Sequence, residues 1–234
     1  MESQVQINLQ EEASSTEKNK KPKKQKKNRF KCWQSLILLV ATLAISLSAG
    51  YYFSNKYLWN KNADQIEKQL DYYKMQVNEK PNDPTLRVQL GYTYFLKGDT
   101  DSAIKEYQTA KSLDKNFYEA YLNLSIAYDK EKRTDDALQM AAKAVKLSPR
   151  DYKSHLLLGR SYRKLKMYKE ATKSLEEAAR LKPGNTDVVY EVGMTAEAQG
   201  KKKEAEKIYK ETLTYDPTFK PAITALDRLN GKDN

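Results

Sequence analysis

Few residues of this 234-residue chain have the types and spacing that catalysis requires. The chain has one histidine, His155, and one cysteine, Cys32, with no glycine-rich phosphate loop and no cluster of metal ligands. The acidic pairs Asp135-Asp136 and Glu176-Glu177 fit helix surfaces in contact with water. The sequence therefore predicts no enzyme, no catalytic residues, no metal and no cofactor.

The elements that must position these residues repeat every 34 residues. Four small residues, Gly91, Ser125, Gly159 and Gly193, stand at this interval. His155 occupies the place of Tyr121 and Val189 in this frame, which indicates a packing role. The same frame aligns further sets: Leu90, Leu124, Leu158 and Val192; Tyr94, Tyr128, Tyr162 and Ala196; Ala103, Ala137, Ala171 and Ala205; Tyr107, Ala141, Leu175 and Tyr209; Ala110, Ala144, Ala178 and Thr212; Lys115, Pro149, Pro183 and Pro217.

This pattern predicts pairs of helices that pack closely. A leucine, a small residue and, three positions further on, a tyrosine lie on one helical stripe, so a partner helix can approach at the small residue. The recurrent alanine in the second half of each repeat allows the same approach from the other side. Proline at the end stops the second helix.

These motifs resemble the tetratricopeptide repeat family. The resemblance implies an all-α fold, an α-solenoid of about four repeats with flanking helices. Four positions depart from the family pattern, each weakening one contact: Ser125 replaces glycine, Ala196 tyrosine, Thr212 alanine and Lys115 proline.

We divide the chain accordingly. We expect a packing helix from about Asp64 to Asn78 before the repeats and a capping helix from Pro221 to Asn230 after them. The predicted boundaries are 1–32 for a disordered polybasic tail, 33–53 for a transmembrane helix, 54–83 for a linker and packing helix, 84–219 for four repeats (84–117, 118–151, 152–185 and 186–219), and 220–234 for the capping helix and tail.

The segment from Trp33 to Phe53 has the length and composition of a membrane span. It carries no charged residue, and as a helix it would be about 31 Å long, near the ~30 Å of a hydrocarbon core. Aromatic residues flank it as interfacial anchors. These are Trp33 on one side and Tyr51, Tyr52, Phe53, Tyr57 and Trp59 on the other.

Residues 1–31 contain nine Lys or Arg against four acids, whereas Lys56 and Lys61 are the basic residues that closely follow the span. By the positive-inside rule the N-terminus is cytoplasmic and the repeats are extracytoplasmic. A cleaved signal peptide is the alternative, with small-residue sites at 46–48 or 48–50. Cys32, before the apolar run, cannot be a lipoprotein cysteine, and a single cysteine excludes an internal disulfide.

The net charge of +11 is diffuse apart from the N-terminal tail. No arginine cluster with interleaved aromatic residues is present, so we predict no nucleic-acid partner.

The resemblance implies that the first helices of the repeats line a groove that binds a protein or peptide. Its apolar start and basic third repeat suit a segment with hydrophobic anchors and a carboxylate that meets Arg160 or Arg163. The carboxylate clamp of co-chaperone members is absent, because the chain matches it only at Asn123 and Lys153, whereas Val88, Tyr92 and Leu157 occupy its other positions. The expected groove residues are Val88, Tyr92, Phe95, Leu122, Ile126, Asp129, Lys153, Leu156, Arg160, Arg163, Tyr190 and Met194.

The sequence thus predicts a membrane-anchored repeat scaffold that binds a polypeptide. Similar anchored repeat proteins serve bacterial envelope assembly, secretion or protein maturation, which is what the resemblance implies here. A self-assembling structural protein, whose repeats stack end to end between chains, is the alternative, and the oligomeric state stays open.

Overall fold

The computed structural model describes residues 32–54 and 60–231, in which it contains helices and no strand. The all-α prediction is confirmed. The chain divides into two compact units, Met1–Tyr57 and Leu58–Asn234. The expected disordered tail, the anchors Tyr57 and Trp59 and the last three residues lie outside the described residues.

In the first unit, helix α2 spans Cys32–Phe53. Its 18-residue stretch Leu36–Phe53 has a mean hydropathy of 2.0, and its apolar side chains are exposed throughout. By length and composition alone, this helix could cross a membrane.

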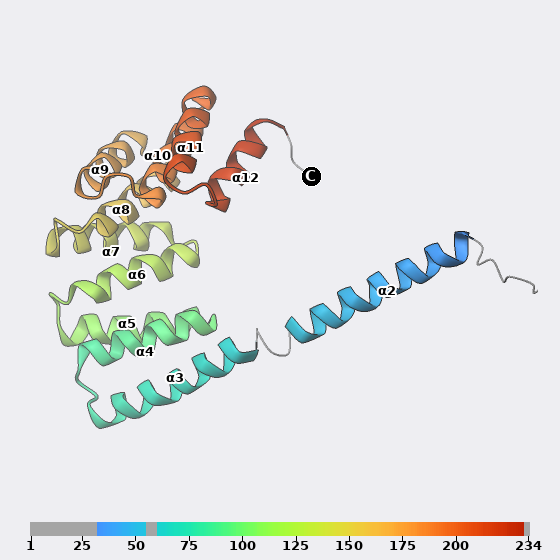
Figure 1. The fold of residues 1–234 in the computed structure, drawn as a ribbon. Helices are drawn as coiled ribbons and strands as arrows, with labels where there is room; N and C mark the ends of the chain where they lie inside the picture. The colour runs from blue at the N-terminus through green and yellow to red at the C-terminus, as the bar shows by residue number, and fades with distance from the viewer. Residues whose placement is uncertain (1–31, 55–59, 232–234) are drawn as a thin grey trace, which may run out of the picture. The chain divides into compact units, whose positions relative to one another are not determined.

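The second unit is a stack of paired helices (Figure 1). Each of the four repeats contributes two helices, and each helix packs against the next one along the chain. The repeats contain α4 (Pro84–Lys97) and α5 (Thr100–Leu113), α6 (Tyr118–Lys130) and α7 (Thr134–Leu147), α8 (Tyr152–Lys164) and α9 (Tyr168–Leu181), and α10 (Thr186–Ala198) and α11 (Lys202–Tyr215); α3 (Asn60–Glu79) precedes them and α12 (Lys220–Leu229) follows them.

The turn inside each repeat uses one left-handed residue. Gly98 and Gly200 have φ of 90° and 79°, and Lys132 and Lys166, at the same place in their repeats, have φ of 59° and 61°. A left-handed backbone ends the first helix and returns the chain antiparallel. The glycines signal this turn in the sequence, whereas the lysines do not.

The close approach of the two helices explains the small residue of each repeat. A Cβ atom on Gly91 would lie 2.6 Å from the ring of Tyr107, and one on Gly159 would lie 2.7 Å from Cγ of Leu175. In the second repeat the facing position, 16 residues later, holds the small residue Ala141, which leaves room for the side chain of Ser125. The serine hydroxyl is buried without a hydrogen-bond partner in the described structure.

This arrangement predicts opposite effects of alanine at two matched positions. Gly159→Ala forces a Cβ atom against Leu175 and is expected to lower the free energy of unfolding by about 1–3 kcal/mol. Ser125→Ala removes an unpaired hydroxyl and is expected to leave stability unchanged or to raise it slightly. Urea unfolding followed by circular dichroism measures both, and equal losses would contradict the packing described.

Candidate protein-binding groove

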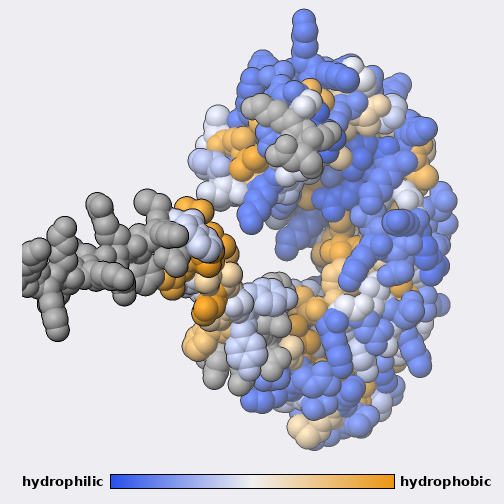
Figure 2. All heavy atoms as spheres, turned by 90° about the vertical axis from the view of Figure 1, so that its right-hand side faces the viewer, coloured by the Kyte–Doolittle hydropathy of each residue, from blue (hydrophilic) through white to orange (hydrophobic). Residues whose placement is uncertain are grey.

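The first helices of the repeats form the candidate groove. Helix α4 contacts α6, α6 contacts α8, and α8 contacts α10, in addition to their contacts with the second helices. Figure 2 shows a hollow in the stack, where apolar surface lies beside hydrophilic surface. The sequence-predicted groove residues all lie on these four helices.

The first two repeats supply exposed apolar side chains. Tyr92 on α4 is 44% exposed and Ile126 on α6 is 36% exposed, while Phe95 and Leu122 are half-buried. Val88 is buried in the core, so it supports this surface from below. Leu96, also 44% exposed, is an apolar residue of α4 that the sequence analysis did not select.

The last predicted positions are less accessible. Leu156 is buried in the core of the third repeat. Tyr190 and Met194 are half-buried and pack against the cluster around Tyr209, and the rings of Tyr190 and Phe219 meet edge to face with centroids 5.5 Å apart. These three residues therefore act mainly in packing, whereas Lys153 is exposed.

The two arginines expected to meet a partner already hold a carboxylate of this chain. Nε of Arg160 donates to Oε2 of Glu191 at 3.0 Å, and Nε of Arg163 donates to Oε1 at 2.5 Å. The Glu191 side chain is 3% exposed. The sequence pattern did not predict a role for Glu191. Its equivalents in the other repeats are Gln89, Asn123 and Leu157, so an acid at this position was the signal that could have indicated one.

Glu191 belongs to a series of contacts that join successive first helices. Asp129 on α6 pairs with Lys164 on α8 at 2.5 Å, so its carboxylate is not free for a ligand. The series also includes the Lys130 ammonium over the Phe95 ring at 4.4 Å, both arginines with Glu191, and Arg228 with Glu197 at 2.7 Å.

The contact between Arg228 and Glu197 shifts the pKa of the Glu197 carboxyl. Burial works against the charge of Glu197, but hydrogen bonds from Arg228 and Tyr209 outweigh burial and lower the pKa of this carboxyl below its ordinary value. Burial and the bond to Glu197 raise the pKa of the Tyr209 hydroxyl. The carboxylate therefore stays charged and holds α12 against α10.

Two observations outside the groove concern catalysis and metal binding. His155 lies on α8 with Nε2 3.0 Å from the carbonyl oxygen of Pro149, a contact that closes the turn before its helix. Within residues 32–54 and 60–231, no group of three His, Cys, Asp or Glu residues could hold a metal ion.

Two families match parts of the chain in sequence. The family described as anaphase-promoting complex, cyclosome, subunit 3 matches residues 130–212, and the TPR repeat family matches residues 91–132. No curated protein matches the chain.

Several solved structures share the fold. The crystal structure of MamA is 24% identical, with a TM-score of 0.58 over 67% of this chain and 92% of MamA. YrrB, described as a TPR protein with an unusual peptide-binding site, is 18% identical, with a TM-score of 0.58 over 74% of this chain and 89% of its own. A chain of the APC/C hetero-tetramer Cut9–Hcn1 is 16% identical, with a TM-score of 0.66 over 73% of this chain and 34% of its own.

The buried carboxylate gives a prediction for the groove. Glu191→Gln replaces a charged acceptor between two arginines with a neutral amide and is expected to lower the free energy of unfolding by about 2 kcal/mol. Glu119→Gln, on the exposed face of α6, is the control and is expected to change stability by less than about 0.5 kcal/mol. Chemical denaturation of both variants tests this, and a neutral Glu191→Gln would refute the structural role of the pair.

Proposed function

Because the chain is a tetratricopeptide repeat protein, we propose that it is a scaffold that binds a polypeptide segment in the groove of its first helices. The observation that carries this proposal is the exposed apolar surface of Tyr92, Leu96 and Ile126 on two neighbouring helices. Soluble surfaces rarely keep large apolar side chains together unless they bind something.

The charges of the groove restrict the ligand. Asp129, Arg163 and Glu197 hold partners within the chain, so they determine the spacing of the helices more than they recognise a ligand. Lys153 is exposed, and Arg160 uses only Nε in its described bonds, which leaves its terminal nitrogens for an acceptor. The groove thus suits a segment with two apolar anchors followed by one acidic group.

We further propose that α2 anchors the protein in a membrane, with the N-terminus cytoplasmic and the repeats extracytoplasmic. The uncharged stretch Leu36–Phe53 and the basic residues before it support this orientation. In that setting the scaffold would serve envelope protein assembly, secretion or protein maturation.

The ends of the stack argue against end-to-end assembly. Gln69 of α3 occupies the place that Ala103, Ala137 and their equivalents hold in the repeats, and it is exposed. Asp227 of α12 occupies the place of the small residue and is also exposed. A second copy would have to bury both polar side chains where the repeats bury alanine and glycine, which costs free energy.

Site-specific photocrosslinking tests the groove in the full-length protein. A crosslinking amino acid at Ile126 is expected to give partner adducts in native membranes, because this side chain lies in the apolar part of the groove. The matched control is Ile223 on α12, which is similarly exposed at 39% but lies at the end of the stack. Equal adducts at both positions, or none at Ile126, would refute the groove as the binding surface.

Cysteine labelling tests the orientation. In a Cys32→Ser background, Asn230→Cys is expected to react with a membrane-impermeant maleimide in intact cells, whereas Ser15→Cys is expected to react only after permeabilisation. The reverse pattern would overturn the proposed topology. Loss of the Ser15→Cys label together with a shorter mature mass would show that the segment is cleaved as a signal peptide.

A further inference from the structure

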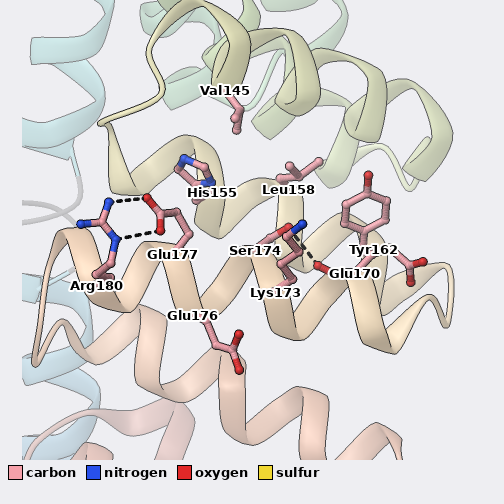
Figure 3. Close-up of a pocket in the computed structure, with 10 residues that line it drawn as sticks. All are labelled: Val145, His155, Leu158, Tyr162, Glu170, Lys173, Ser174, Glu176, Glu177 and Arg180. Carbon is pink, nitrogen blue, oxygen red and sulfur yellow. Dashed lines mark hydrogen bonds and ion pairs between the residues drawn. The ribbon is translucent and has the colours of Figure 1, made fainter.

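A hollow between the second and third repeats lies apart from the groove (Figure 3). Its volume is about 630 Å³, and its walls come from α7, α8 and α9. None of the predicted groove residues lines it. Its lining includes Val145 of α7, His155, Leu158 and Tyr162 of α8, and Ser174 and Glu177 of α9.

Two of the lining positions, His155 and Ser174, hold other residue types in the other repeats. The first repeat fills these positions with the ion pair of Arg87 and Glu106, whose charged atoms lie 2.9 Å apart. Ser174 is small, and its hydroxyl folds back to donate to the carbonyl oxygen of Glu170 at 2.9 Å. His155 and Ser174 form no such pair, and Ser174, 8% exposed, lies at the base of the hollow.

The second and fourth repeats fill the same place with aliphatic side chains. Met140 packs against the core cluster of the first two repeats, and Tyr121, at the position of His155, is 7% exposed. Ile208 packs against the cluster of the fourth repeat, with Cγ2 3.3 Å from the position of a Cβ atom on Gly193. The fold itself thus shows the size and chemistry of a side chain that fits at this position.

The surface of the hollow is consistent with an apolar occupant within a polypeptide. Val145, Leu158 and the Tyr162 ring contribute apolar surface, and Figure 3 shows them around one space. Glu177 and Arg180 are paired with each other at 2.6 Å. Lys173 and Glu176 have no ion-pair partner in the described structure, so the rim offers both signs of charge and does not favour a polyanion.

We infer that this hollow is a second binding site, which receives an aliphatic side chain of methionine or isoleucine size from a partner polypeptide. The side chain takes the place that Met140 and Ile208 fill in their repeats. Burial of its apolar surface drives binding, and the charged rim contacts the flanking residues. The site is separate from the groove, so each can fail without the other.

A methyl-labelled sample of the full-length protein in detergent tests the inference by NMR. The probe is N-acetyl-methionine methylamide, which presents a methionine side chain on a peptide-like backbone. With about 13 non-hydrogen atoms it is expected to bind with a Kd on the order of 1 mM. The methyl signals of Val145 and Leu158 are expected to shift saturably, while N-acetyl-glycine methylamide leaves them unchanged.

Ser174→Met supplies the decisive control because it restores the residue type of the second repeat. The variant is expected to fold with an unchanged or higher melting temperature and to lose the probe-induced shifts. No saturable shift in the wild-type protein, or the same shifts in a folded Ser174→Met protein, would overturn the inference. If that variant fails to fold, two further variants test the inference. Lys173→Met, at the rim, is expected to retain the probe-induced shifts, whereas Leu158→Ala is expected to weaken binding of the probe at least threefold. Unchanged binding by Leu158→Ala would overturn the inference.

Discussion

The close approach between the two helices of each repeat is the constraint on which the rest of this structure depends. At Gly91, Gly159 and Gly193 the opposing side chain lies where a Cβ atom would have to be. Such contact at a single position fixes the axial register of one helix against the other, because sliding by a residue would bring a larger side chain into the notch. Each repeat therefore forms a unit of fixed geometry, and the stack is built from such units.

A second set of interactions decides how the units follow one another. The Lys130–Phe95 contact and the ion pairs of Asp129 and Glu191 join each first helix to the next, and the pair of Arg228 and Glu197 joins α10 to the capping helix α12. These contacts therefore set the spacing of successive first helices. In this chain Arg163 and Asp129 pair within the stack, so the recognition that we propose would fall to Tyr92, Leu96, Ile126, Lys153 and Arg160.

The repeat architecture could be predicted from the sequence because its signals are local and recur at a fixed interval. Gly98, Gly200 and the prolines after the second helices mark where the chain turns, and the small residues mark where the helices of a repeat touch. The groove could be predicted only as a set of positions. Their exposure depends on contacts between repeats, such as that of Glu191 with two arginines, and a 34-residue frame aligns equivalent residues without showing which of them meet.

The four repeats have equivalent positions, so a residue in one repeat can be compared with its equivalents in the others. Ser125 departs from glycine where the facing residue is Ala141, so this exchange is compensated within the repeat and needs no functional explanation. Ser174 departs from Met140 and Ile208, and together with His155 and Val145 it lines a hollow. Where a smaller residue replaces a larger one and no neighbour fills the space, apolar surface stays in contact with solvent. This exposure lowers the stability of the fold unless a bound ligand covers the surface. Comparison between repeats thus separates a departure that its facing residue compensates, at Ser125, from one at which we infer a binding site, at Ser174.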